Sequence, residues 1–346
     1  MKMKFLLQLA IITRKKAATI IIFGFIHLLV STSPLIAQDA AKADPLQSWN
    51  DQSAKQQIIG FVTAVTTKGN PKYVAPAERI ATFDNDGTLW CEQPVVQGAF
   101  ILYRLTKMVE NDPSLKERQP FKAALENDKA YLKTEGMPAI LELFSATHAG
   151  MTDEEFSAEV REFMAAAKHP KFGRGFGELT YQPMIELLEY LRSHGFKTFI
   201  CSGGGIDFMR AISESLYGIP PEQVIGSSGK KVFAEGEDGW SMTRTGELSF
   251  FNDKNDKAVN IDLHIGRRPL IAMGNVRSHG DIGMCAYSQG RKGPSLQLLV
   301  NHDDAVREFS YAEDDGGSLK AAKANGWIVV SVNKDWNVVF STEEEK

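Results

Sequence analysis

Five short and almost wholly apolar runs constrain the fold more than any other feature of the sequence. They are RIATF (79–83), KTFIC (197–201), PLIAM (269–273), LQLLV (296–300) and WIVVSV (327–332), and helical or turn-rich segments separate them. A strand that is apolar on both faces must be covered on both faces, which is typical of parallel sheets whose strands alternate with helices. The sequence therefore predicts an α/β fold with a Rossmann-like parallel-sheet core.

Residues 95–181 interrupt this alternation and contain no convincing strand pattern. VVQGAFILYRLTKMVEN (95–111) has apolar residues at three- and four-residue spacing, and Thr152 to Glu155 form a capping-box sequence that opens another helix. Ligands of open α/β sheets bind outside the carboxyl ends of the strands, so a helical insertion after the first core strand is expected to cover that edge. The predicted organisation is an N-terminal helical leader (38–78), a core (79–94 and 182–346) and a helical cap (95–181), with one or two short hairpins in 226–250.

The first 37 residues have the order of a secretory signal peptide. Basic residues up to Lys16 precede an apolar run from Ala17 to Val30, and small and turn-prone residues (31–34) and then Leu35-Ile36-Ala37 follow. The run is shorter than the roughly 18 residues that a membrane span needs. We expect cleavage near Ala37 and a periplasmic or secreted protein; the alternative is an uncleaved anchor that leaves the domain facing the periplasm.

The net charge restricts the classes of partner that the protein can bind, and the cysteine content leaves its disulfide state open. Removal of residues 1–37 takes away five basic residues and no acidic one, which leaves 34 basic against 43 acidic residues and moves the formal charge from −4 to −9. An acidic surface argues against nucleic acid or an anionic membrane as the main partner, but leaves room for a local pocket for a small anion. The three cysteines, Cys91, Cys201 and Cys285, each lie near a motif, and the sequence leaves open whether two of them pair.

Two carboxylates, Asp84 and Asp86, directly follow the first apolar run in the stretch FDNDGT. Such a pair repels unless a cation lies between its members or one of them holds a proton. Mg²⁺ prefers oxygen ligands and uses few carboxylates together with a substrate phosphate. Residues two apart on an extended chain face one side, so one carboxylate can attack phosphorus while the other handles a proton.

Other polar residues follow later strands. Ser202, with the amides of Gly203 and Gly204, offers an anion-binding nest at a predicted helix start. A lysine from NDKNDK, either Lys254 or Lys257, would neutralise the nucleophile and the phosphoryl oxygens. His302 and Asp303 follow the run 296–300 and are interpreted as loop residues.

These motifs resemble those of the haloacid dehalogenase superfamily, in particular its phosphoserine-phosphatase-like branch. FDNDGTLW resembles the first motif, SGGG the second and GNVRSHGD (274–281) the fourth, and the helical insertion also resembles that branch. The resemblance covers about residues 79–335. The family usually has Gly-Asp where this chain has Gly274-Asn275, and the interval from Asn275 to Asp281 is longer than usual.

The resemblance implies a role for each matching residue. Asp84 would be the nucleophile that forms an aspartyl-phosphate, and Asp86 the general acid and base. Lys257 fits the third motif better than Lys254. The implied substrate-binding residues are Thr88, Ser202, Gly203 and Gly204, and the implied Mg²⁺ ligands are Asp84, Asp86 through its backbone carbonyl, Asn275 and Asp281.

The resulting functional hypothesis is a secreted, Mg²⁺-dependent phosphomonoester hydrolase that acts on a small phosphorylated metabolite. The sequence leaves two alternatives open. One is a phosphotransferase that moves the phosphoryl group to an alcohol. The other is a catalytically weak protein that binds a phosphorylated ligand, which the change to Asn275 would favour if it has cost the metal site.

Overall fold

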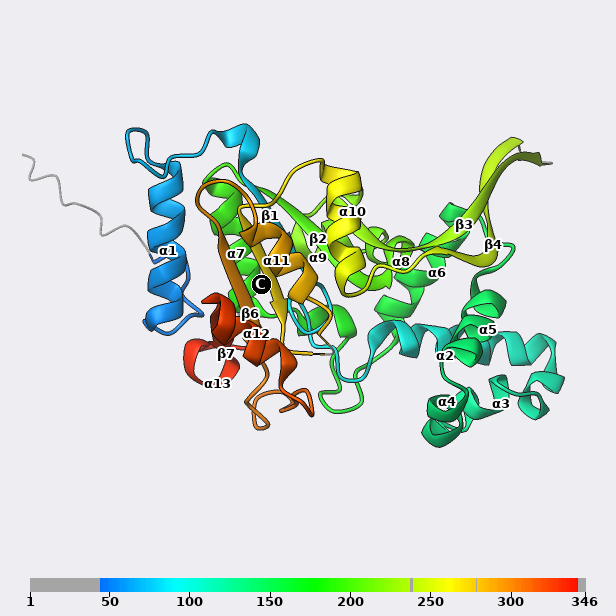
Figure 1. Ribbon diagram of the computed structural model, residues 1–346. Coiled ribbons are helices and arrows are strands. Elements are labelled where there is room, and N and C mark those ends of the chain that lie inside the picture. The colour runs from blue at the N-terminus through cyan, green and yellow to red at the C-terminus, as the bar shows by residue number, and fades with distance from the viewer. Residues whose placement is uncertain (1–43, 237–238, 278, 342–346) are drawn as a thin grey trace, which may run out of the picture. The chain divides into compact units, whose positions relative to one another are not determined.

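A seven-stranded sheet in the order β4-β3-β2-β1-β5-β6-β7 forms the centre of the fold (Figure 1). The computed structural model describes residues 44–236, 239–277 and 279–341, so the predicted signal peptide lies outside the described residues. All neighbouring strands are parallel except β3 and β4. The strands are β1 (Ile80–Phe83), β2 (Lys197–Gly205), β3 (Val224–Gly236), β4 (Gly239–Phe250), β5 (Ile271–Asn275), β6 (Leu296–Asn301) and β7 (Ile328–Ser331).

Alternating strand residues feed two separate apolar layers, one on each face of the sheet. Met273 and Leu298 pack into the layer that contains α1 and α7, whereas their neighbours Ala272 and Leu299 pack into the layer that contains α10 and α11. Successive side chains of a strand point to opposite faces, so a run that is apolar throughout supplies both layers. The helices that flank the sheet are α1 (Ser53–Thr66), α7 (Gln182–Ser193), α10 (Asn255–Ile265), α11 (Ile282–Gln289), α12 (Gly317–Asn325) and α13 (Val332–Asp335).

The cap is inserted between β1 and β2 and is helical throughout. Its two connections to the core run antiparallel, with Cys91 N donating to Leu179 O at 3.0 Å and Tyr181 N donating to Leu89 O at 2.9 Å. Thr152 caps α6 through a complete capping box, as the sequence predicts. The cap helices are α2 (Val96–Asn111), α3 (Phe121–Leu125), α4 (Lys129–Glu135), α5 (Met137–His148) and α6 (Asp153–Ala166).

Strands β3 and β4 form a single long hairpin that belongs to the sheet at one end and contacts the cap along its middle part, and its far end extends past the cap helices (Figure 1). The first residues of β3 pair with β2, and its later residues pair only with β4. Arg244 of β4 exchanges backbone hydrogen bonds with Gly150 and Met151, both at 2.9 Å, and these residues link α5 to α6. The hairpin is therefore longer than the short hairpins predicted, and it joins core and cap.

The predicted fold class is confirmed: an α/β fold with a parallel core sheet and a helical cap inserted after the first core strand. Two local expectations differ. The helix predicted to start after Ser202 is instead two short helices, α8 (Ile206–Arg210) and α9 (Ser213–Tyr217). The helix in the predicted leader begins only at Ser53, and its buried residues, such as Ile58 and Val62, belong to the core layer around α7.

Two further observations concern the described residues. None of their helices is both long enough and apolar enough to cross a membrane. Cys91, Cys201 and Cys285 are all buried and form no disulfide with one another, so they act as small apolar residues beside the strand ends.

Candidate active site

The loop after β1 carries the two aspartates to the carboxyl edge of the sheet. Asp84 N still donates to Met273 O of β5 at 2.9 Å, which holds this residue in line with the strand. Gly87 then turns the chain with a φ of +69°, a backbone conformation that favours glycine. Its N–H donates to Trp90 O at 3.0 Å and closes a tight loop around Asp86.

Lys257 joins this loop to the strand-end segment after β5. Its Nζ donates to Asp84 Oδ1 at 2.8 Å and to Asp281 Oδ1 at 2.5 Å, and all three side chains are buried. Lys254 is exposed and lies at the start of α10 with a φ of +54°. Of the two lysines that the sequence leaves open, the structure therefore brings Lys257 to the nucleophile position.

Asn275, the last residue of β5, faces two oxygens of the aspartate loop. Its Nδ2 donates to Asp84 Oδ2 at 3.1 Å and to the backbone carbonyl of Asp86 at 2.8 Å. Its Oδ1 is buried and has no hydrogen-bond partner among the described residues. Rotation of the amide by 180° exchanges Nδ2 and Oδ1, which would turn the same place into a set of three oxygens. One carboxylate and two carbonyl oxygens suit Mg²⁺, which keeps several waters and adds substrate phosphate.

Asp281 is used differently from the way the resemblance implies. Its Oδ1 accepts from Lys257, and its Oδ2 accepts from the backbone N–H of Asn275 at 2.9 Å. A Cβ at Gly274 would lie 2.2 Å from the Asp281 carboxyl carbon, so only glycine lets this carboxylate approach β5. Because both oxygens are engaged by the chain itself, the geometry favours Asn275 over Asp281 as a metal ligand.

Asp86 lies on the side of the loop that faces β2. Its Oδ1 accepts from Trp90 Nε1 at 2.8 Å, and its Oδ2 lies 3.5 Å from the hydroxyl of Ser202. Burial raises the pKa of Asp86, because water no longer stabilises the charged form. A buried carboxyl of raised pKa holds a proton more readily than an ordinary aspartate, which suits a proton donor.

The Ser-Gly segment differs from the predicted nest at a helix start. Residues 202–205 continue β2, because Gly205 still pairs with Ser227 of β3. Gly204 N donates to Ser202 Oγ at 3.0 Å, and Gly205 N donates to Gln97 Oε1 at 2.8 Å. Of the two amides expected to form the nest, that of Gly204 is thus already engaged, and the next amide, that of Gly205, is held by a cap residue.

Thr88, a substrate-binding residue in the resemblance, lies on the inner side of the aspartate loop. It is fully buried, and its hydroxyl lies 3.4 Å from Asn275 Nδ2. This location makes Thr88 a neighbour of Asn275 on the inner side of the loop.

The charges in this centre depend on one another. Burial raises the pKa of Asp84 well above its usual value, and the Asp281 carboxylate raises it further. Burial alone would lower the pKa of Lys257, but Asp281 and Asp84 outweigh this and hold it above its usual value. Lys257 therefore remains a cation between two carboxylates.

Two side chains that sequence reasoning did not assign to the site support the aspartate loop. His302 Nε2 lies 2.7 Å from the backbone oxygen of Gly87, and its Nδ1 lies 2.6 Å from Glu308 Oε1. Both residues are buried, and His302 lies in the loop after β6, as interpreted from the sequence, where it also supports the aspartate loop. The usable signal was its place just after an apolar run, at the same sheet edge as the motif residues.

Glu92 and Arg277 form a second contact beside the loop. The Glu92 carboxylate is buried and pairs with Arg277, two residues after Asn275. Burial raises the pKa of Glu92 despite this partner. The pair ties the start of the cap to the segment after β5.

One other group of possible metal ligands lies among the described residues, formed by His279, Glu313 and Asp315. Glu313 accepts from the backbone N–H groups of His279 and Ser318, both at 2.6 Å, and Asp315 accepts from Gly317 N at 3.1 Å. These carboxylates cap and order a loop, so the group has a structural explanation without a metal.

Comparisons with known proteins agree with this architecture. A family model described as haloacid dehalogenase-like hydrolase matches residues 81–284. No match was found among curated proteins. A conserved functionally unknown protein from Anaerococcus prevotii DSM 20548 is 15% identical over 86% of this chain and 98% of its own, with a TM-score of 0.54.

Two further solved structures are more distant. A protein with unknown function from Bordetella pertussis Tohama I is 15% identical over 73% of this chain and 98% of its own, with a TM-score of 0.47. A probable phosphoserine phosphatase from Vibrio cholerae is 15% identical over 72% of this chain and 67% of its own, with a TM-score of 0.37.

Proposed function

The chain belongs to the haloacid dehalogenase-like hydrolase family, because the family model matches more than half of its length. On this basis we propose that the protein is a phosphatase that hydrolyses phosphomonoesters through an aspartyl-phosphate. The family predicted from the sequence is thereby confirmed, and the cap lies between β1 and β2, as the phosphoserine-phosphatase-like resemblance implies. The observation that carries the proposal is the convergence of Asp84, Asp86, Ser202 and Lys257 from three places in the core, which are the loop after β1, strand β2 and the first turns of α10.

Asp84 is the proposed nucleophile. Its Oδ1 accepts from Lys257 Nζ, which holds the carboxylate at the edge of the sheet, and its Oδ2 faces the side-chain amide of Asn275. Attack on phosphorus forms the bond from Asp84 to the phosphoryl group and breaks the bond to the ester oxygen, and the leaving alcohol carries away that electron pair. Lys257 stabilises the negative charge of the phosphoryl oxygens as the bond forms.

Asp86 is the proposed acid and base. Its raised pKa allows it to hold a proton that passes to the leaving ester oxygen. In the second step the same carboxylate removes a proton from the water that attacks the aspartyl-phosphate, which regenerates Asp84. Ser202, 3.5 Å from Asp86 Oδ2, orients this side chain and the bound phosphoryl group.

The residues that would hold Mg²⁺ are Asp84, the backbone carbonyl of Asp86, and Asn275 after rotation of its amide. When bound, the ion supplies positive charge that stabilises the phosphoryl oxygens in the transition state. Only one of these three ligands carries a charge, so the proposed site binds Mg²⁺ more weakly than a site with a second carboxylate.

The test is hydrolysis of 4-nitrophenyl phosphate by the purified protein, with Mg²⁺ and with EDTA. We expect turnover with Mg²⁺, loss in EDTA and recovery when Mg²⁺ is restored. Full activity in EDTA would overturn the metal assignment, and binding of phosphate without any turnover would identify the binding-protein alternative. Phosphoryl transfer to an added alcohol, faster than release of phosphate, would identify a phosphotransferase.

Export is proposed from residues 1–37 alone. The basic, apolar and small-residue order supports a cleaved signal peptide and a periplasmic or secreted enzyme that acts on a small phosphorylated substrate. Protein isolated from the periplasm is expected to begin near Gln38. Protein that keeps Met1 and remains in the cytosol would contradict this part of the proposal.

A further inference from the structure

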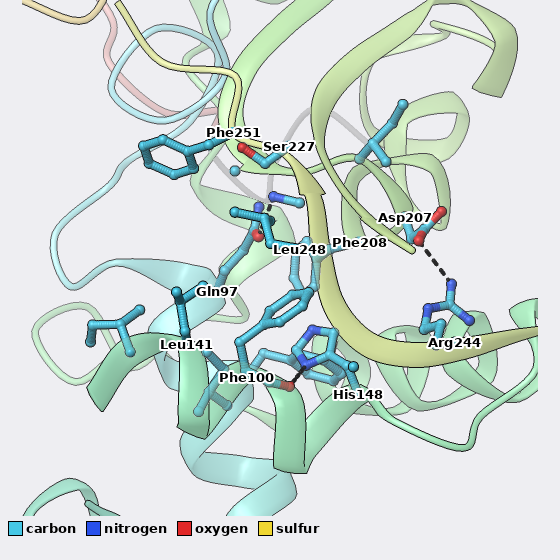
Figure 2. A pocket seen from close by; sticks show the side chains of 18 of the residues that line it. Gln97, Phe100, Leu141, His148, Asp207, Phe208, Ser227, Arg244, Leu248 and Phe251 are labelled. Atoms are coloured by element: carbon cyan, nitrogen blue, oxygen red, sulfur yellow. Dashed lines mark hydrogen bonds and ion pairs between the residues drawn. The ribbon is translucent and has the colours of Figure 1, made fainter. Parts of the chain in front are cut away.

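An apolar cavity of about 200 Å³ lies between the cap and the Ser-Gly segment of the core (Figure 2). It is bounded by α2 and α5 of the cap, by the β3–β4 hairpin and by residues 203–205, which directly follow Ser202. Most of its lining is apolar or aromatic, as with Phe100, Ile140, Leu141, Phe144, Leu248 and Phe251. The cavity therefore shares Gly203 and Gly204 with the proposed phosphoryl site.

Several of the lining residues are unusually exposed for apolar side chains. Ile140, Leu141 and Phe251 are 42%, 37% and 44% exposed. Contiguous exposed apolar side chains in a concave site are typical of ligand pockets. An engineered cavity of about 150 Å³ with a comparable lining holds one benzene molecule, so this cavity can hold an aromatic ring or a short alkyl chain.

Gln97 marks the boundary between the cavity and the phosphoryl site. Its Oε1 accepts from Gly205 N at 2.8 Å, and its Nε2 is buried without a partner among the described residues. A Cβ at Gly204 would lie 2.3 Å from this Nε2, so the unpaired N–H₂ group sits directly over the segment that follows Ser202. A buried donor without a partner is costly, and an oxygen of a bound ligand would satisfy it.

The charged lining residues are already paired with other side chains. Asp207 and Arg244 lie 3.1 Å apart, and Asp207 also accepts from Lys231 at 2.8 Å. Lys230 pairs with Glu247 at 2.5 Å. His148 is buried against Phe144 and Phe156 and hydrogen-bonds to Phe144 O at 2.9 Å. None of these groups is left to pair with a charged substrate body.

We propose that this cavity binds the leaving group of the substrate and selects phosphomonoesters whose alcohol is uncharged and apolar, about the size of an aromatic ring or a short alkyl chain. This inference rests on the proposed phosphatase function, because the cavity can hold the leaving group only if the neighbouring site binds the phosphoryl group. The phosphate lies at Asp84 and Ser202 with its ester oxygen at Asp86, a phosphoryl oxygen accepts from Gln97, and the apolar part of the alcohol fills the cavity. Amino-acid and sugar phosphates are poor substrates, since their charged or hydroxylated bodies would lose water without gaining partners.

The first test measures kcat/KM for the n-alkyl phosphates from ethyl to hexyl phosphate. Their alcohols are alike as leaving groups, so the chemistry stays constant while the apolar surface grows. Burial of each added methylene group is expected to raise kcat/KM about three- to fourfold until the cavity is full. Benzyl phosphate, also an ester of a primary alcohol, is expected to exceed O-phosphoserine at least tenfold. A flat series, or a preference for O-phosphoserine, would overturn the inference.

A matched pair of variants tests whether this cavity produces the gradient. Leu141→Asp places a charge at the cavity wall, and Leu102→Asp changes an equally exposed cap leucine (39% against 37%) that does not line the cavity. In Leu141→Asp, the rise in kcat/KM with each added methylene group is expected to disappear almost completely. In Leu102→Asp, the same rise is expected to persist. An unchanged gradient in a folded Leu141→Asp protein would place the alkyl chain elsewhere.

Binding without turnover separates failure of the inference from failure of the proposed function. The dissociation constants of n-alkylphosphonates, which carry no hydrolysable ester, are measured by calorimetry with Mg²⁺ present. A three- to fourfold gain in affinity for each methylene group supports the cavity assignment even if no ester is hydrolysed, and in that case only the phosphatase proposal fails. Hydrolysis of esters together with equal affinity for every phosphonate overturns the cavity assignment and leaves the phosphatase proposal standing.

Discussion

The polar centre at the sheet edge and the apolar cavity beside it are built from different parts of the chain. Every side chain of the centre comes from a strand end or helix start of the core, and Lys257, Asp84 and Asp281 are buried and mutually bonded. The cavity draws its walls from cap helices and from the hairpin β3–β4, and several of its side chains are exposed. The two regions meet at Gly203, Gly204 and Gln97.

This difference separates reaction type from substrate choice. Strand ends of a packed sheet hold functional groups rigidly, and catalysis requires that reacting groups are held in fixed positions. The side chains that line the cavity lie mostly on cap helices and on the hairpin, away from the strand ends that carry the proposed reacting groups. A change in the centre should therefore alter the rate for all esters, whereas a change in the cavity should alter the ranking of esters.

Asp84→Asn is expected to have the largest effect. It keeps the shape of the side chain but removes the nucleophile, so turnover should fall by more than about 10³-fold for every ester. The measurement is turnover of 4-nitrophenyl phosphate together with acid-quench trapping of radiolabelled phosphoenzyme. A phosphoenzyme that still accumulates in this variant would assign the nucleophile to another residue.

Asp86→Asn is expected to follow, with a loss that depends on the ester. Proton transfer typically contributes about 10²- to 10⁴-fold. The loss should be smallest for 4-nitrophenyl phosphate, whose leaving group needs little protonation, and largest for alkyl phosphates. Equal losses for both ester types, in protein with unchanged thermal stability, would reject the acid and base role.

His148, which lines the cavity, allows the cap to be tested through the pH dependence of folding stability. Burial lowers its pKa from 6.5 to about 4, so between these values the unfolded chain binds a proton that the folded cap does not. Stability should be complete above pH 6.5 and decrease as the pH falls toward 4, by at most about 3 kcal/mol. Denaturant unfolding at pH 7 and pH 4.5 checks this, with His148→Gln as the variant that should lose less on acidification. Equal acid sensitivity of both proteins would contradict it.

Asn275→Asp is expected to have the smallest effect and to sharpen the metal assignment. A second carboxylate near Asp84 should lower the Mg²⁺ concentration for half-maximal activity about tenfold, because affinity rises with ligand charge. Without metal the added charge repels Asp84 and Asp86, so the melting temperature in EDTA should fall. An unchanged Mg²⁺ requirement would place the ion away from Asn275.

The sequence was sufficient for the core and for most of the centre. Continuous apolar runs require a doubly covered sheet, and polar residues after such runs meet at one edge, which is why Asp84, Asp86 and Ser202 were found. The position of Asn275 could be predicted for the same reason. Its contacts with Asp84 and the Asp86 carbonyl could not, because they depend on how the loop turns at Gly87.

Other features depend on tertiary contacts that leave no local signal. Which of Lys254 and Lys257 reaches the site depends on the backbone conformation at the start of α10. The two hydrogen-bonded oxygens of Asp281 depend on the space that Gly274 leaves by having no side chain. The cavity could not be predicted at all, since its walls come from segments as distant in the chain as Phe100, Leu141 and Leu248. Apolar helix residues look alike in sequence whether they face a core or a cavity.

The contact between the His302 imidazole and the backbone oxygen of Gly87 has a consequence for transferring this chemistry to another scaffold. The match to the family ends at residue 284, before β6, β7 and the His302–Glu308 pair. A graft of residues 81–284 would carry both aspartates, the serine, the lysine and the Asn275–Asp281 segment. It would leave the outer carbonyl of the aspartate loop without its imidazole partner and β5 without its neighbour β6. A functional transplant therefore has to include residues 296–311, although none of them touches the proposed reacting atoms.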